Sequence, residues 1–447
     1  MSRLAIWMNG ERVGTWSRER GTDALSYETS WLSSPHARPL SLSLPFTATR
    51  RVAGAEVTHF FDNLLPDSRA IRERIGRRFG AAPDDGFALL SAIGRDCVGA
   101  VQLLPPDADP GDVRTLNCER LREVDVERLL RGAAGASPFA GAEPEEDDIL
   151  RLSLAGAQEK TALLRVSGHW CRPHGSTPTT HLLKLPLGMV GGLRGIDLRD
   201  SVENEWLCMT LLAAMGLPAA AVEIVRFGEH KTLCVERFDR AWMEGRRWIA
   251  RLPQEDFCQA TGTPPARKYQ KDGGPGLSRC LALLAGSEAP SLDRTRFLLA
   301  QLAFWMLGAI DGHAKNFSVF LRAGGTYALT PLYDVLSVYP VLGRGKGRLP
   351  RQKAHLAMSV RGKSPHSQLD DVEPRHWLDE ARRAGMPQLA GTMREMASAV
   401  PSAVSHVEAR LPAGFPERVW APVVSGLRQA ADGFLAGTEV DRAPARR

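Results

Sequence analysis

The sequence has no long hydrophobic run that could cross a membrane. Its longest apolar stretch, 297–310, is interrupted by Gln301 and is shorter than the roughly 18 residues that a spanning helix needs. The first residues, MSRLAIWMNGERVG, turn polar after eight positions and give no hydrophobic segment typical of a secretory signal. We therefore expect a cytoplasmic protein with no membrane partner.

Paired cysteines are also lacking. The seven cysteines are scattered, and no two of them form a C-x-x-C pair. This spacing argues against a zinc site and against a disulfide framework, so we expect reduced thiols that mostly fill the core.

The net charge is only +6, from 57 basic and 51 acidic residues. Such a small excess permits a polyanionic partner without requiring one.

The 447 residues are too many for one simple core, so several domains are expected. Residues 132–149 combine Gly, Ala and Pro with an acidic run, which is typical of a linker. We predict a β-rich module over residues 1–131, a strand-rich region over 150–236 and a mostly helical region over 237–440. Strands followed by helices favour an α+β protein with two lobes.

Local signals predict several elements. Asn9-Gly10 between two strand-like runs predicts a β-hairpin, and strict alternation over 40–44 predicts a strand. Asp67 or Ser68 is expected to cap a helix that ends at Gly80. From about residue 276 onward the periodicity is helical, with one hairpin expected at 317–333.

The most informative stretch is GAIDGHAKNFSVF, residues 308–320. It follows the apolar run, which predicts a buried helix. The interval from Asp311 to Asn316 equals that between the catalytic Asp and the metal-binding Asn of protein kinases. In that chemistry the Asp accepts or orients the proton of the attacking hydroxyl, and the Asn holds magnesium. Lys315 could neutralise charge on the transferring phosphoryl group.

This spacing is weak by itself, and Asp334 in PLYDVLS strengthens it. The hairpin predicted between the two sites would bring Asp334 back beside Asn316, where a second hard oxygen ligand would complete a magnesium site. Val335 and Leu336 stand where kinases usually have Phe-Gly. The same triplet would also suit a small-molecule or lipid kinase.

Two further parts of a kinase site precede this loop. LAGAQEK, residues 154–160, joins two predicted strands with small residues that let backbone N–H groups approach phosphate. Lys184 lies on an apolar strand, where its ammonium requires an anion such as a phosphate or the carboxylate of Glu205. Lys184 could instead be an edge-strand lysine that reaches solvent, and Glu205 could merely favour a helix start.

Other residues keep plainer interpretations open. His313 could be a hydrogen-bonded structural histidine, and Ser153 could be the polar half of a strand alternation. The basic run 343–353, GRGKGRLPRQK, predicts a loop that either lines a substrate groove or is simply solvated.

Taken together, these motifs resemble the HipA family, the serine/threonine kinase toxins of bacterial HipA–HipB toxin–antitoxin modules. The resemblance extends along almost the whole chain and rests on long strings, namely ARPLSLSLP, FFDNLLPDS, IGRDCVGAV, SLAGAQEKTALL, TPTTHLLKLP, VENEW, VERFDR, RLPQEDFCQ, DGGPG, GAIDGHAKNFSVF and LYDVLSVYPVLG. It implies a two-lobed protein-kinase-like fold with a β-rich N-lobe, an extra N-terminal module, a mostly helical C-lobe and ATP bound in the cleft between the lobes.

The resemblance also implies residue roles. Asp311 would be the catalytic acid/base, and Asn316 and Asp334 would hold Mg²⁺. Residues 155–160 would form the phosphate loop, Lys184 would contact the phosphates, and 236–238 would meet adenine. The implied ATP-binding residues are Ala155, Gly156, Ala157, Gln158, Glu159, Lys160, Lys184, Glu236, Arg237, Phe238, His313, Ala314, Lys315, Asn316, Tyr333 and Asp334. Ser153 matches the family's autophosphorylated serine, whose modification would be inhibitory.

The implied substrate is a translation component, an aminoacyl-tRNA synthetase such as glutamyl-tRNA synthetase, whose phosphorylation would halt growth and give persistence. The implied partners are a HipB-like helix-turn-helix antitoxin and operator DNA. Arg382 and Arg383 match a family phosphate contact, whereas the family's second basic position corresponds to Gly385. We therefore expect the antitoxin to make most of the DNA contact. A non-catalytic co-repressor is the alternative from another class.

Overall fold

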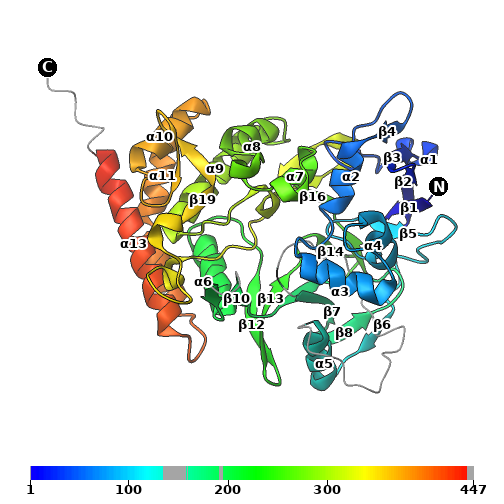
Figure 1. The fold of residues 1–447 in the computed structure, drawn as a ribbon, viewed down its shortest axis with the longest axis horizontal. Helices are drawn as coiled ribbons and strands as arrows, with labels where there is room; N and C mark the ends of the chain where they lie inside the picture. Colours follow the sequence, from blue (N-terminus) through cyan, green and yellow to red (C-terminus); the bar gives the residue numbers. More distant parts are fainter. Residues whose placement is uncertain (1, 134–157, 159, 191–194, 440–447) are drawn as a thin grey trace. The chain divides into compact units, whose positions relative to one another are not determined.

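The chain forms two compact units in a computed structural model that describes residues 2–133, 158, 160–190 and 195–439 (Figure 1). Unit 1 comprises Met1–Leu185, Val225–Lys268 and Ser318–Ala328, and unit 2 comprises Pro186–Ile224, Tyr269–Phe317 and Leu329–Arg447. Strands and helices occur in both units, so the protein is α+β as predicted. The predicted domain boundaries at 131, 149 and 236 stay a prediction, and residues 134–149 of the expected linker lie outside the described residues.

Unit 1 begins with the predicted hairpin. Asn9 and Gly10 have φ angles of 47° and 86°, and positive values at both positions are what a type I′ turn requires. The hairpin belongs to a five-stranded sheet of order β4-β3-β2-β1-β5. Its strands are β1 (Ser2–Met8), β2 (Glu11–Glu19), β3 (Thr22–Tyr27), β4 (Arg51–Ala53) and β5 (Gln102–Leu104).

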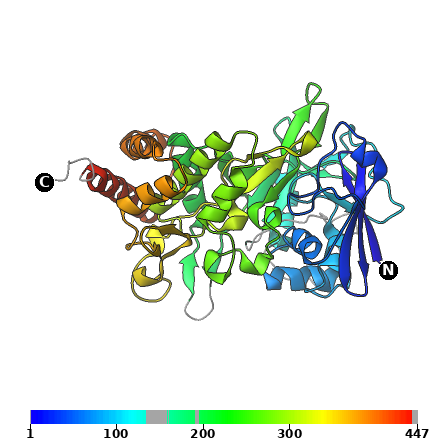
Figure 2. The same ribbon diagram turned by 90° about the horizontal axis from the view of Figure 1, so that it is seen from above.

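Aromatic side chains join this sheet to its helices. Trp16 of β2 stacks on Phe61 with ring centroids 3.9 Å apart and lies 4.4 Å from Phe87. Ser68 caps α3 by accepting from the amide of Ile71, and Gly80 ends it with φ 67°, as predicted. Figure 2 shows helices beside the N-terminal sheet. The helices of this part are α1 (Thr29–Leu32), α2 (Ala55–Asp62), α3 (Arg69–Phe79) and α4 (Gly86–Ile93).

The strand expected over residues 40–44, all of which are described, is wrong. Leu44 donates its amide to the carbonyl of Ser41 at 3.0 Å, which makes a tight turn with a single bridge between these residues. The carboxyl group of buried Glu255 accepts from the amide of Leu42 at 2.8 Å and from the hydroxyl of Ser41. The Glu255 side chain thus accepts the hydrogen bond of a backbone amide that would pair with a neighbouring strand in a β-sheet.

The buried Glu255 carboxyl predicts a pH dependence of stability. Burial raises the pKa of Glu255 from 4.5 to about 8, although the hydrogen bonds from Leu42 and Ser41 oppose the rise. The folded state therefore holds this proton more tightly than the unfolded state, so its contribution is complete below about pH 4.5 and is lost as pH rises towards 8. In that window the free energy of unfolding should fall by up to about 1.4 kcal/mol per pH unit.

Urea denaturation at several pH values between 5 and 8 checks this expectation. Glu255→Gln removes the titrating group, so its free energy of unfolding should lack the downward slope seen in the wild-type protein. Parallel slopes in the two proteins would contradict the assignment of the slope to Glu255.

A second sheet of unit 1 contains several predicted strands and follows the order β12-β13-β9-β7-β8-β6. Leu163 and Leu183 are fully buried between this sheet and α5, where they pack with Leu130. The elements are β6 (Cys118–Arg120), α5 (Glu123–Ala133), β7 (Lys160–Val166), β8 (His169–Pro173), β9 (His181–Lys184), β12 (Val222–Phe227) and β13 (His230–Glu236). Shorter elements complete the unit, namely β14 (Arg240–Met243), β15 (Trp248–Arg251), β16 (Gln254–Asp256), α7 (Phe257–Ala260), β17 (Ser318–Leu321) and β18 (Tyr327–Leu329).

Unit 2 is built around the predicted buried helix α9 (Pro290–Leu307). The helices α10, α11 and α13 lie together in Figure 1, and α11 and α13 contact α9. The other elements are β10 (Gly188–Val190), β11 (Ile196–Leu198), α6 (Ser201–Ala214), α8 (Leu277–Leu284), β19 (His355–Arg361), β20 (Pro365–Gln368), α10 (Pro374–Arg383), α11 (Leu389–Ser398), α12 (Val400–Glu408) and α13 (Glu417–Glu439).

The β19–β20 hairpin corrects the expectation of a single hairpin after residue 276.

No helix in the described part of the chain is long and apolar enough to cross a membrane. None of the seven cysteines, which all lie within the described ranges, forms a disulfide, and six of them are buried.

Candidate functional site

The loop after α9 carries the candidate catalytic residues. The helix ends because Gly308 adopts a left-handed conformation with φ 62°, which a glycine allows without strain. The loop then closes on itself: His313 donates its amide to the carbonyl of Asp311 at 2.7 Å, and the side-chain amide of Asn316 donates to the same carbonyl at 2.8 Å. Asp311 and Asn316 are therefore held in one tight turn of backbone.

The Asp311 side chain is 60% exposed, but its position is fixed by aromatic neighbours. The Tyr269 hydroxyl donates to Oδ1 at 2.6 Å, and Nε2 of His313 lies 4.0 Å from Oδ2. The Tyr269 ring meets the His313 ring edge-on, with centroids 4.9 Å apart. One carboxylate oxygen thus has a fixed donor, while the other is available to a substrate hydroxyl.

Sequence reasoning missed Tyr269, which follows the basic segment that ends at Lys268. Tyr269 and Asp311 are separated by 42 residues, and no periodicity or motif spacing connects them. Only the tertiary fold of unit 2 reveals that a phenol supports the candidate catalytic carboxylate.

The candidate metal ligands lie in the same unit. Asn316 and its neighbour Lys315 are 5% and 6% exposed. The Tyr333 hydroxyl donates to the carbonyl of Lys315 at 2.9 Å, which ties the residue before Asp334 to the loop. Asp334 has φ 61°, a left-handed conformation that is uncommon outside glycine and that clusters at functional sites.

The chemistry of these donors fits magnesium. Mg²⁺ keeps several waters and usually takes only one or two carboxylates together with substrate phosphates. Carbonyl and carboxylate oxygens of Asn316 and Asp334 are ligands of this kind. Within the described ranges no group of three or more His, Cys, Asp or Glu residues is placed so that it could hold a metal ion.

The other phosphate-binding candidates belong to unit 1. Lys160 of β7 and Lys184 of β9 are direct cross-strand partners, and Lys184 is only 5% exposed. Two of the predicted phosphate contacts therefore lie next to each other on neighbouring strands. Gln158 donates its side-chain amide to the carbonyl of Leu185 at 2.5 Å, beside the same strand. The remaining predicted loop residues lie outside the described residues, namely Ser153, Ala155, Gly156, Ala157 and Glu159.

The segment predicted to meet adenine follows β13. Glu236 is exposed and pairs with His181 of β9, and the Phe238 ring meets Phe320 edge-on at 5.8 Å. The Arg237 side chain is turned to other partners and is 6% exposed. A ligand contact at this segment would therefore come from its backbone or from Glu236 and Phe238.

Arg237 belongs to what we term the buried charge cluster, which consists of Asp96, Arg237, Asp239, Arg240 and Arg251. Asp96 accepts from Arg240 at 2.9 Å and from Arg251 at 3.1 Å, and it lies 3.4 Å from Arg237. Arg237 also makes two hydrogen bonds to Asp239 at 2.9 and 2.8 Å. Burial alone would raise the pKa of Asp96, but the three guanidinium groups outweigh it and hold the pKa well below its usual range. The cluster is therefore ionised and nearly dry.

The predicted DNA-contact residues lie at the end of α10. Arg382 forms an ion pair with Asp379, and Arg383 donates to the carbonyl of Gly362 at 3.0 Å. Gly385, where the resembled family has a second basic position, has φ 71° just after the helix end. A left-handed residue at this place favours glycine over a basic residue.

Two family models match the chain: the HipA N-terminal domain over residues 4–104 and the HipA-like C-terminal domain over residues 152–404. The chain is 33% identical over 413 residues to the Y4mE protein of Sinorhizobium fredii, covering 90% of this chain and 91% of that protein. It is 30% identical over 330 residues to the serine/threonine-protein kinase toxin HipA of Shewanella oneidensis, covering 71% and 70%.

The fold also matches a solved structure. The HipA chain in a complex of HipA, HipB and operator DNA from Shewanella oneidensis superposes with a TM-score of 0.79 at 24% identity, covering 98% of this chain and 99% of that chain. This likeness shows that the two proteins share the HipA kinase fold, which is the two-lobed α+β fold predicted from the sequence.

Proposed function

The chain belongs to the HipA family and is therefore a kinase, and we propose that it transfers the γ-phosphate of ATP to a serine or threonine of a protein as the toxin of a toxin–antitoxin pair. The observation that carries this proposal is the loop 311–316. Its backbone and the Asn316 side chain converge on the carbonyl of Asp311, and the Tyr269 hydroxyl donates to the Asp311 carboxylate.

In this mechanism Asp311 orients the acceptor hydroxyl and takes its proton, with Tyr269 fixing the carboxylate. Asn316 and Asp334 would hold a magnesium ion, which neutralises charge on the ATP phosphates when bound. Lys160 and Lys184 would contact the phosphates. Lys315, together with its neighbours His313 and Ala314 and with Tyr333, would line the nucleotide site. Phosphoryl transfer depends mainly on positioning and electrostatic stabilisation, and the proposed residues would supply both.

We further propose that the target is a translation component, an aminoacyl-tRNA synthetase, whose phosphorylation arrests growth. Ser153 would be autophosphorylated. A phosphate at that position adds about −1.5 to −2 charge beside the ATP phosphates, so repulsion would displace the loop and inhibit the kinase. Both parts of this proposal rest on the sequence motifs and on family membership.

One solved structure with this fold is the HipA chain of a complex with HipB and operator DNA. We propose that this chain likewise binds a HipB-like antitoxin and represses its own operon with it. Arg382 and Arg383 already have partners within the chain, so the antitoxin would make most of the DNA contacts.

Incubation of the purified chain with γ-labelled ATP, magnesium and total cell protein tests the proposed substrate class. We expect label in at least one protein besides the kinase, on serine or threonine, because the acceptor must reach the exposed Asp311 carboxylate. Label confined to lipids or small metabolites would overturn the protein-kinase proposal in favour of the alternative that the Asp-Val-Leu triplet leaves open.

A further inference from the structure

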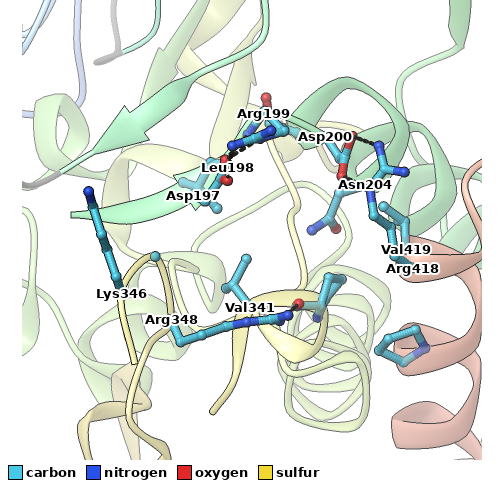
Figure 3. Close-up of a pocket in the computed structure, with 14 residues that line it drawn as sticks. Asp197, Leu198, Arg199, Asp200, Asn204, Val341, Lys346, Arg348, Arg418 and Val419 are labelled. Atoms are coloured by element: carbon cyan, nitrogen blue, oxygen red, sulfur yellow. Dashed lines mark hydrogen bonds and ion pairs between the residues drawn. The ribbon is translucent and has the colours of Figure 1, made fainter. Parts of the chain in front are cut away.

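A pocket of about 480 Å³ in unit 2 lies outside the set of residues assigned to catalysis (Figure 3). It is lined by β11, the start of α6, the segment Tyr339–Val341, the basic loop and α13. The lining residues are Asp197, Leu198, Arg199, Asp200, Ser201, Asn204, Pro340, Val341, Lys346, Gly347, Arg348, Arg418, Val419 and Pro422. Its size is within the range of pockets that bind ligands.

The charges of the pocket do not balance. Arg199 pairs with Asp197 at 2.6 Å, and Arg418 makes two hydrogen bonds of 2.7 Å to Asp200. These two pairs neutralise themselves. The remaining two lining cations, Lys346 and Arg348, come from the same loop, and neither forms a close ion pair among the described residues. Arg348 is nevertheless near Asp197, because the pKa of that carboxyl is lowered by Arg199 and, to a smaller extent, by Arg348.

Lys346 and Arg348 differ in how they are held. The Arg348 guanidinium donates to the carbonyl of Pro340 at 2.6 Å, which leaves most of its five N–H groups for another acceptor. The ammonium of Lys346 makes no ion pair with any part of the chain that the structure describes, and Figure 3 draws no interaction for it. Gly347, between them, accepts from the amide of Asp197 at 3.0 Å, so the loop is fixed to β11.

The pocket is attached to the catalytic loop by a short chain of hydrogen bonds. Asn204, in the pocket lining, donates to the carbonyl of Ser337 at 2.7 Å, and Val338 donates its amide to the carbonyl of Gly308 at 3.0 Å. Pro340 lies six residues after Asp334, so the two cannot be more than about 20 Å apart. An extended peptide of about six residues could span the interval between the pocket and the proposed magnesium ligand.

We propose that this pocket binds an acidic segment of the protein substrate, within about six residues of the phosphorylated serine or threonine. Lys346 and Arg348 supply the two cations, and Pro340, Val341 and Val419 supply apolar contact. A nucleic acid is disfavoured because its continuous phosphate backbone would need more cations than Lys346 and Arg348, the two that the carboxylates of the pocket leave in excess. The proposal rests on the proposed protein-kinase function and specifies its substrate class.

Fluorescence anisotropy with the full chain tests the proposal directly. The probe is a labelled peptide of about 15 residues with one central serine flanked by aspartates, compared with peptides in which glutamine or lysine replaces aspartate. We expect the acidic peptide to bind about tenfold more tightly than the glutamine peptide. Lys346→Glu should abolish this preference, because four cations and two carboxylates in the lining become three of each and the net charge falls from +2 to zero.

Arg344→Glu is the matched control, since it makes the same charge change in the same loop but does not line the pocket. It should preserve the preference for the acidic peptide. Equal weakening by both variants, or no preference in the wild-type protein, would overturn the proposal. Tighter, Lys346-dependent binding of a single-stranded oligonucleotide would overturn it in favour of nucleic acid. Binding through Lys346 without any protein labelling by γ-labelled ATP would contradict the proposed function while the pocket assignment stands.

Discussion

Replacing Asp311 by asparagine is expected to lower the rate of phosphoryl transfer to protein by about 10²–10⁴-fold. Asparagine has nearly the same shape and can still accept the Tyr269 hydrogen bond through its amide oxygen. It cannot take a proton from the acceptor hydroxyl. The loss should therefore appear in kcat, whereas the fold and the affinity for ATP should change little.

Steady-state phosphorylation of the labelled protein substrate and calorimetric titration with an ATP analogue measure these two quantities separately. Asp272→Asn is a suitable control, because Asp272 is an exposed carboxylate in the segment just after Tyr269. It should retain full activity. Tyr269→Phe should have a kcat about tenfold below that of the wild-type protein, because the carboxylate loses only its fixed orientation. Its activity should therefore lie between those of Asp272→Asn and Asp311→Asn.

The same variant distinguishes the kinase from a non-catalytic co-repressor. If catalysis causes the proposed growth arrest, cells that express Asp311→Asn should grow, and the proposed operator binding with an antitoxin should persist. Continued toxicity of a variant without phosphoryl transfer would mean that the toxic action lies elsewhere in the chain.

Elements whose signals are local could be predicted from the sequence. The turn at Asn9-Gly10 and the capped helix α3 depend on residues within a few positions, so their patterns carry the necessary information. The strand expected at 40–44 failed because its backbone is satisfied by Glu255, 214 residues away from Ser41. The β19–β20 hairpin could have been found, since Leu356, Met358 and Val360 alternate along β19 and all three are buried.

In the candidate site, too, local features could be predicted from the sequence and long-range contacts could not. The loop from Asp311 to Asn316 folds on itself, so its spacing could suggest a kinase site, although the roles of its residues stay predictions. Tyr269 could not be found because its relation to Asp311 exists only in the folded unit. Arg237 was assigned to the nucleotide through a motif, whereas its side chain is committed to Asp96, 141 residues away, and to Asp239.

Replacing Asp96 by asparagine is expected to destabilise the protein by about 3–5 kcal/mol, a large part of the roughly 5–15 kcal/mol that holds a typical domain folded. The variant leaves three buried guanidinium groups with Asp239 as the one remaining carboxylate of the cluster. Thr179, which donates its hydroxyl to Asp96 at 2.7 Å, would lose a charged acceptor as well. The free energy of unfolding from urea denaturation measures the effect. Glu73→Gln, which removes an exposed ion pair with Arg69 in the same unit, should leave the unfolding midpoint unchanged.

A double variant separates the loss of charge balance from the loss of packing. Arg251→Met removes one of the guanidinium groups that face Asp96 at 3.1 Å and keeps an unbranched side chain of similar length. If uncompensated charge is the cause, Asp96→Asn should cost less in the Arg251→Met background than in the wild-type protein, with a coupling energy of about 1–3 kcal/mol. Additive effects would instead mean that these residues stabilise unit 1 through separate contacts.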